Sequence, residues 1–214
     1  MLDLDFAIEN VEVAPFAAAP LLLFKLRVAN ADAGMCIQSV ALTCQIKLEV
    51  ARRHYRAGDH ERLRDLFGER ERWSQTLHSM LWTFASAGVP SFSGSTVVDL
   101  PVPCTYDFNV AATKYFYGLN DGDVPLTFLF SGTVFYPAED GTLQVDQIPW
   151  DKEATFRLPV QVWSAMMAHY YPNGAWLRLR RDVFDRLYRY KVGRGLPTWE
   201  QAFESLMDAL DVAV

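Results

Sequence analysis

The hydrophobic pattern of this chain of 214 residues changes its period at Pro159 and keeps the new period to the last helix. Before Pro159 the apolar residues mostly alternate with polar ones, which is the period of a β-strand with one buried face. After Pro159 they recur every three to four residues, as on one face of a helix. A chain with strands first and helices last is expected to have an α+β fold.

The strand-like part predicts an antiparallel β-sandwich. Runs at 4–13, 21–28 and 36–50 are separated by a proline break and by the turn-forming stretch 30–34. In the third run, one alternating set is expected to be buried: Cys36, Gln38, Val40, Leu42, Cys44, Ile46 and Leu48. Strands of this length joined by short turns are typical of antiparallel sandwiches.

The middle of the chain continues this pattern. Further strands are expected at 95–102, 104–117, 126–136, 143–148 and 154–158, with a turn at 120–123. Gly132 lies inside an apolar run, which indicates a bulge or a close approach of two backbones. Between 76 and 84, helix and strand patterns compete, and an extended segment is slightly favoured.

A charged stretch interrupts the strands near 59–73. Arginines alternate with acidic residues there, while Leu63, Leu66 and Phe67 fall on one helical face that Gly68 ends. We interpret it as a short inserted amphipathic helix with solvated charges; a basic recognition surface is the alternative.

About three helices are expected after Pro159. Pro172 ends the first, Asp182 can cap the second, and Thr198 with Gln201 matches a capping box for the third. The second helix is expected to turn Val183, Phe184, Leu187 and Tyr188 inward. Since no long linker is evident, we predict a single domain, 1–214: a sandwich over 1–158 with a helical layer over 159–214 packed on it.

Composition narrows the function classes. The net charge of −6 argues against a general nucleic-acid binder. No apolar run approaches the roughly 20 residues needed to span a membrane, so no membrane partner is expected. Three cysteines without a signal-like start favour a cytoplasmic, soluble protein.

The sequence offers no recognisable catalytic or metal site. His54, His60, His78 and His169 are scattered, Cys36 and Cys44 lie on the expected core face, and Cys104 follows a proline. Neither a tight metal-ligand pair nor a nucleophile elbow is present. We therefore expect no catalytic residue, no metal and no cofactor, and leave open an enzyme built from dispersed residues.

One stretch concentrates aromatic and basic residues. Between Arg178 and Arg194, seven basic residues stand against two acidic ones, a net +5, which leaves −11 for the rest of a chain of net charge −6. Such a piece can face an acidic protein partner or a second copy. The candidate partner-binding residues are Tyr170, Tyr171, Trp176, Arg178, Arg180, Arg181, Arg189, Tyr190 and Arg194. Core packing is the alternative for the aromatic residues, and is favoured for the tryptophans.

Several runs carry a family resemblance: VAATKYF, PLTFLFSGTVFY, QIPWDKEATFRLPV and AWLRLRRDVFDRLYRYK, followed by GLPTW. Over most of its length the chain resembles an uncharacterised bacterial family of about 200 residues, encoded near nickel–iron hydrogenase genes. The resemblance implies an accessory or assembly role and assigns no functional residue. A β-sandwich module that holds a small hydrophobic or saccharide ligand between sheet and helices is the alternative function.

Overall fold

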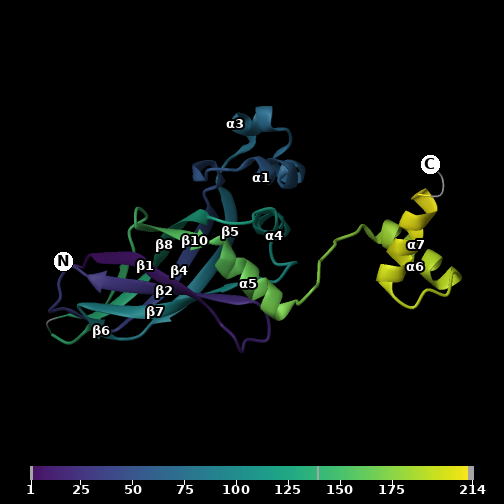
Figure 1. The fold of residues 1–214 in the computed structure, drawn as a ribbon. Helices are drawn as coiled ribbons and strands as arrows, with labels where there is room; N and C mark the ends of the chain where they lie inside the picture. The colour runs from purple at the N-terminus through teal and green to yellow at the C-terminus, as the bar shows by residue number, and fades with distance from the viewer. Residues whose placement is uncertain (1, 139, 212–214) are drawn as a thin grey trace. The chain divides into compact units, whose positions relative to one another are not determined.

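Two antiparallel sheets packed face to face make up most of the computed structural model, which describes residues 2–138 and 140–211 (Figure 1). The first sheet has the order β1-β2-β7, formed by Leu4–Val13, Leu21–Asn30 and Ser95–Pro103. The second has the order β10-β8-β4-β5, formed by Glu153–Pro159, Asp123–Pro137, Ser39–Leu48 and Met80–Val89. β9 (Leu143–Gln147) pairs with β8, and β3 (Cys36–Ile37) pairs with β6 (Phe92–Ser93). The expected α+β fold with an antiparallel sandwich is confirmed.

The core lies between the sheets, where the period-two pattern places it. In β2 the fully buried residues are Leu22, Phe24, Leu26 and Val28. Phe24 meets three aromatic residues of the opposite sheet, with ring centroids 5.2 Å from Phe128, 5.9 Å from Phe156 and 6.4 Å from Trp82. Burying a side chain of this size stabilises the fold by about 2–3 kcal/mol.

The predicted alternation holds in β4 from Val40 onward but is wrong for Cys36 and Gln38, which are exposed. The strand is interrupted at Gln38, so that β3 ends at Ile37 and β4 begins at Ser39. Ile37 is fully buried in place of Cys36, because β3 pairs with β6 and β4 pairs with β5 and β8. The break therefore shifts the alternation by one residue.

The inserted stretch forms several short helices. These are the 3-10 turns η1 (Val50–Arg52) and η2 (Arg70–Arg72), and the helices α1 (Ala57–Arg62), α2 (Arg64–Phe67) and α3 (Trp73–Thr76). Gly68 ends α2 with φ of 74°, as predicted. Figure 1 shows α1 and α3 at one end of the sheets. The extended segment favoured for 76–84 is β5, which begins at Met80.

The strand predicted for 104–117 is wrong. Residues 104–109 form turns, and α4 follows over Val110–Tyr117. The side chain of Asn109 accepts a hydrogen bond from the backbone N–H of Ala112 (3.0 Å) and so caps the helix. Ala112, Tyr115 and Phe116 are buried at helical spacing. Tyr106, Phe108 and Val110 alternate with polar residues at the start of this run and so imitate a strand pattern.

The three C-terminal helices are confirmed as α5 (Val160–Tyr170), α6 (Arg181–Gly193) and α7 (Trp199–Asp211). Their starts differ in detail from the prediction. Pro159 is the N-cap of α5, and Asp182 lies in the first turn of α6, whose N-cap is Arg180. At α7, the Thr198 hydroxyl accepts from the Gln201 N–H at 3.2 Å, as the capping box requires.

The chain separates into two compact units, Met1–Gly174 and Ala175–Val214. α5 belongs to the first, and its Trp163, Met166 and Met167 are part of the buried core. α6 and α7 belong to the second and contact each other; we name this second unit the helical pair. The packing of these two helices on the sandwich stays a prediction.

Candidate functional site: the helical pair and an aromatic pocket

The predicted partner-binding residues fall in both units. Tyr170 and Tyr171 end α5 in the first unit, and the other seven lie in the helical pair. The hydroxyl of Tyr170 donates to the backbone oxygen of Ala14 and accepts from the N–H of Ala17 at 3.1 Å. It therefore joins α5 to the loop between β1 and β2, and its polar end is already occupied.

Four of the arginines are exposed along the start and middle of the helical pair. Arg178 and Arg180 precede α6, Arg181 begins it and Arg189 lies in its third turn. Arg180 pairs with Asp182, with Nη2 and Oδ2 3.2 Å apart. The Arg189 side chain donates to the backbone oxygen of Asp185 at 3.3 Å. Both pairs are local, so they leave these guanidinium groups on the surface.

The aromatic candidates differ in exposure. Trp176 is 38% exposed in the segment before α6. Tyr190 is half-buried, and its hydroxyl lies 2.7 Å from that of Ser205 on α7. Arg194 lies over the Tyr190 ring at 5.4 Å. Tyr190 therefore contributes to the contact between the two helices, whereas Trp176 lies on the surface.

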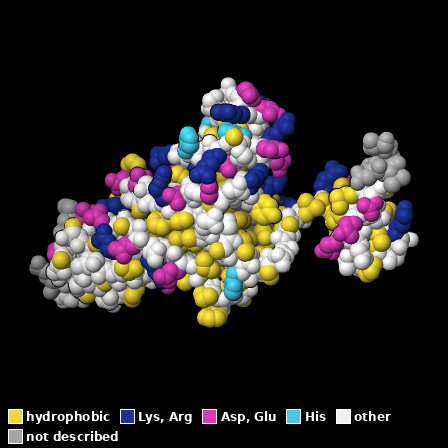
Figure 2. Space-filling model, in the orientation of Figure 1, with side chains coloured by type: hydrophobic (Ala, Val, Ile, Leu, Met, Phe, Trp, Pro, Cys, Tyr) yellow, Lys and Arg dark blue, Asp and Glu magenta, His cyan; other side chains and the backbone are white. Residues whose placement is uncertain are grey.

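The helical pair also exposes aromatic residues that the sequence analysis placed inward. Phe184 is 43% exposed and Tyr188 is 52% exposed. Among the described side chains of α6 none is buried, and in α7 only Ala202 is. The apolar arc of α6 is wider than one neighbouring helix can cover. The width of this arc in the sequence could have predicted that Phe184 and Tyr188 are exposed. Figure 2 shows hydrophobic side chains on the surface of this unit beside charged ones.

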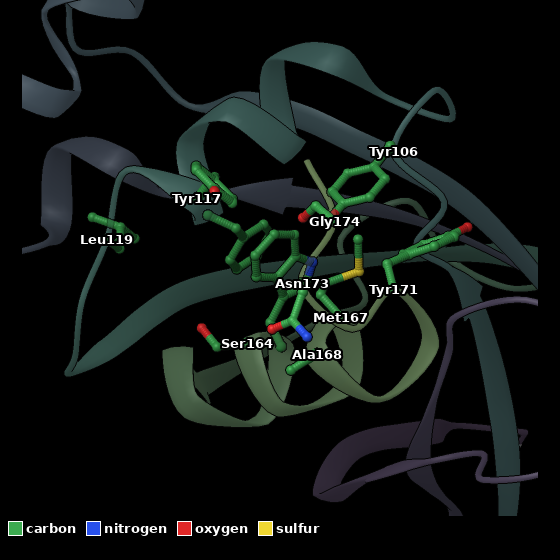
Figure 3. Close-up of a pocket in the computed structure, with 11 residues that line it drawn as sticks. Tyr106, Tyr117, Leu119, Ser164, Met167, Ala168, Tyr171, Asn173 and Gly174 are labelled. Carbon is green, nitrogen blue, oxygen red and sulfur yellow. Dashed lines mark hydrogen bonds between the residues drawn. The ribbon is translucent and has the colours of Figure 1, made fainter. Parts of the chain in front are cut away.

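In the first unit, an aromatic pocket of about 250 Å³ lies beside α5 (Figure 3). Its lining includes the mostly buried Phe116, Leu119, Trp163 and Met167. Tyr106 and Tyr171 lie on one side of it, and Tyr117 lies on the opposite side. Phe116 and Trp163 stack at 5.1 Å, and Tyr106 and Tyr171 stack at 4.7 Å.

Polar groups at the pocket are few and uncharged. They are the three tyrosine hydroxyls, Ser164, the Asn173 amide and the backbone of Gly174, which accepts from the Tyr106 hydroxyl at 3.5 Å. Desolvation, followed by the neighbouring Tyr117 and Tyr171, raises the pKa of Tyr106. Tyr106 is therefore a neutral donor and acceptor at physiological pH. Tyr106 and Tyr117 were missed because α4 and the turns before it were expected to form a strand.

The described residues contain no group of three or more histidine, cysteine or acidic side chains placed to hold a metal ion. Cys44 and Cys104 are buried, and burial raises the pKa of each thiol to about 12. Such thiols are poor nucleophiles. His60 packs against Trp73 at 4.4 Å, and His169 lies 3.4 Å from the backbone oxygen of Pro15.

The arginines of the inserted helices contact the turn before β8. Arg53 donates to the backbone oxygens of Asp121 and Asp123, Arg56 pairs with the Asp121 carboxylate, and Arg62 donates to the Asn120 side chain. Contacts of this kind fix a loop, so they favour a structural use over a basic recognition surface at these three positions. No helix in the described part of the chain is both long and apolar enough to cross a membrane.

Fold and surface together define an α+β protein of the antiparallel-sandwich class, with an aromatic pocket in its first unit and an exposed helical surface in its second. The chain belongs to DUF6084, a family of unknown function whose model matches residues 1–213. The curated proteins give no match.

Two solved structures show weak similarity. One is a solution structure described as a late embryogenesis abundant protein, 16% identical, with 73% of this chain and 72% of that chain covered and a TM-score of 0.29. The other is β-glucosidase 3B from Thermotoga neapolitana in complex with α-D-glucose, 11% identical, with a TM-score of 0.26. The match covers 73% of this chain and 17% of the glucosidase. At these TM-scores neither similarity carries an argument.

Proposed function

We propose that this chain is a non-catalytic accessory protein that binds a protein partner with an acidic surface through its helical pair. The supporting observation is the exposure of arginine and aromatic side chains in the same small unit. Arginine, tyrosine and tryptophan are enriched among the residues that dominate binding energy at interfaces. Arg178, Arg181 and Arg186 make no ion pair among the described residues, so they are available to carboxylates of a partner.

The setting proposed for this partner is the maturation or assembly of a nickel–iron hydrogenase, in the cytoplasm. It rests on the resemblance of the chain to a family encoded near hydrogenase genes. Affinity purification of the tagged chain from its own cells, followed by mass spectrometry, is expected to recover a hydrogenase subunit or assembly protein. Recovery of the chain without any such component would contradict the proposed role in hydrogenase maturation or assembly.

The binding surface is tested by charge reversal. In a pull-down with the recovered partner, the double variant Arg180→Glu/Arg181→Glu is expected to bind at least about tenfold more weakly, because it replaces two attractions with repulsions. The matched control is Arg70→Glu/Arg72→Glu, which makes the same charge change at two exposed positions of η2. Equal binding by the two double variants would contradict the proposed surface.

The aromatic pocket supports a second candidate function, the binding of a small uncharged ring-shaped ligand such as a saccharide. Stacked aromatic walls suit the apolar face of a ring, and the rim supplies neutral hydrogen-bonding groups. Saturation-transfer NMR with glucose and with phenol as probes is expected to show transfer that Tyr171→Ala abolishes and Phe16→Ala, a 98% exposed control, retains. No transfer to either probe would dismiss this candidate.

A further inference from the structure

The helical pair has one apolar face that its two helices cover only in part. Phe184, Tyr188 and Val192 recur every fourth residue on α6 and are 43%, 52% and 59% exposed. On α7 the residues with the same spacing are Trp199, Phe203 and Met207, of which Met207 is 56% exposed. We call these six residues the open aromatic face. Residues at this spacing lie in one row along a helix.

The two rows form one continuous surface. The Trp199 ring lies 5.1 Å from Phe184 and 6.4 Å from Tyr188, and 6.5 Å from Phe203 on its own helix. A unit of this size is too small to bury a core of its own, and two amphipathic helices need a further layer on their apolar side. The open aromatic face therefore requires an occupant.

Charges of opposite sign border this face on its two helices. On α7, Glu200, Glu204 and Asp208 each directly follow a residue of the face, and between Trp199 and Asp211 there is no basic residue. On α6, the row Arg181, Asp185, Arg189 runs beside Phe184 and Tyr188, and the helix holds four basic and two acidic residues. Among the described side chains no ion pair joins α6 to α7.

We propose that the open aromatic face binds the same face of a second copy of this chain. A surface made of a net-basic helix and an acidic helix is self-complementary about a twofold axis, since each helix then meets the one of opposite net charge. In that arrangement α6 of each copy faces α7 of the other in a four-helix layer. Arg181 and Arg189, two turns apart on α6, then oppose Glu200 and Asp208, which have the same spacing on α7 of the second copy, while the aromatic rows are buried between the helices.

This inference goes beyond the proposed function and does not depend on it. Of the arginines proposed to bind an acidic partner, only Arg181 belongs to the proposed dimer contact. Arg178 and Arg180 precede α6, and Arg186 lies outside both rows. These residues stay available for an acidic partner in the dimer. Loss of self-association with retained partner binding, or the reverse, would separate the two proposals.

The test is sedimentation equilibrium of the full chain over a range of concentrations. The unaltered chain is expected to show a reversible monomer–dimer equilibrium, and Tyr188→Lys, at an exposed position, is expected to weaken it at least about tenfold. Circular dichroism of each variant checks that the helices still form. A chain that stays monomeric at every concentration would overturn the proposal and leave its own sandwich or another protein as the occupant.

Charge exchange supplies the decisive control. The variants Arg181→Glu/Arg189→Glu and Glu200→Arg/Asp208→Arg are each expected to lose self-association, since like charges then face each other across the axis. An equimolar mixture of the two is expected to form a heterodimer, because the altered α6 of one variant meets the altered α7 of the other, and the two unaltered helices meet as in the unaltered chain. A mixture that fails to associate, or single variants that associate like the unaltered chain, would contradict the twofold arrangement.

Discussion

Gly132 shows how strictly a single residue is determined inside this sandwich. It pairs with Leu42 in the centre of β8 and has φ of 145°, a conformation that favours glycine. A Cβ atom at this position would lie 2.1 Å from the backbone oxygen of Ala41. The sequence predicted a bulge or a close backbone approach here, and the close approach is confirmed.

We expect Gly132→Ala to lower the free energy of unfolding by about 3 kcal/mol, from backbone strain together with the overlap at Ala41. Urea titration measures the change. Gly88→Ala is the matched control, because Gly88 pairs with Ala41 from the other side of β4 and an added Cβ meets nothing within 4 Å. Similar losses in both variants would show that the effect belongs to the strand and not to this contact.

Two buried thiols give the fold a defined response to alkaline pH. The pKa values of Cys44 and Cys104 are raised from 9.0 to about 12 in the folded protein. The folded state therefore keeps both protons in a range where the unfolded chain releases them. Their contribution to stability is complete below pH 9 and falls as the pH rises, by about 1.4 kcal/mol per pH unit for each thiol.

The prediction is a urea midpoint that decreases from about pH 9 to about pH 10.5. Tyr55, whose pKa burial raises to about 12, adds to the slope in the upper part of this range. In the variant Cys44→Ala, the urea midpoint should fall less steeply with pH, because one of the two buried thiols is removed. If the urea midpoint of that variant fell as steeply with pH as in the unaltered chain, the Cys44 thiol would not contribute to the pH dependence.

At the scale of elements, α4 illustrates how one side chain decides an element's type. Besides capping the helix, Asn109 donates through Nδ2 to the backbone oxygens of Leu81 (3.2 Å) and Trp82 (2.8 Å) on β5. One residue thus starts α4 and attaches it to the edge strand of the second sheet. Because Phe116, Tyr117 and Leu119 of this region line the aromatic pocket, Asn109 also positions the pocket wall.

Asn109→Ala is expected to cost about 2 kcal/mol of unfolding free energy, roughly one for the cap and one for the bonds to β5. Asn109→Asp separates the two parts, since a carboxylate keeps the cap but cannot donate to the carbonyls. Thermal and urea unfolding of both variants measure the difference. If Asn109→Asp were as stable as the unaltered chain, the bonds to β5 would contribute nothing.

Strands and C-terminal helices were predictable because burial on one face imposes a period that survives in the sequence. The period could not reveal the register break at Gln38, which depends on the pairing of β3 with β6. Nor could it reveal the aromatic pocket, since Tyr106, Phe116 and Trp163 come from a turn and two helices that only folding brings together. The charge of the helical pair was visible in the sequence, whereas its uncovered aromatic face was not.

At the scale of the whole molecule, the sandwich contains the main buried core. The core cluster runs from Leu4 to Met167, and the partly buried residues packed against it extend to Tyr171. All of these residues lie in the unit Met1–Gly174. The helical pair contributes surface rather than core, because its described residues are mostly exposed or half-buried.

A shortened chain of residues 1–174 is therefore expected to unfold cooperatively, with an unfolding free energy within about 1 kcal/mol of the full chain, since it keeps the entire core cluster. Circular dichroism and urea titration of both chains provide the comparison. The shortened chain is also expected to stay monomeric where the full chain dimerises. A loss of several kcal/mol would instead indicate that α6 and α7 pack on the sandwich, as the single-domain prediction requires, and would make the sandwich itself the occupant of the open aromatic face.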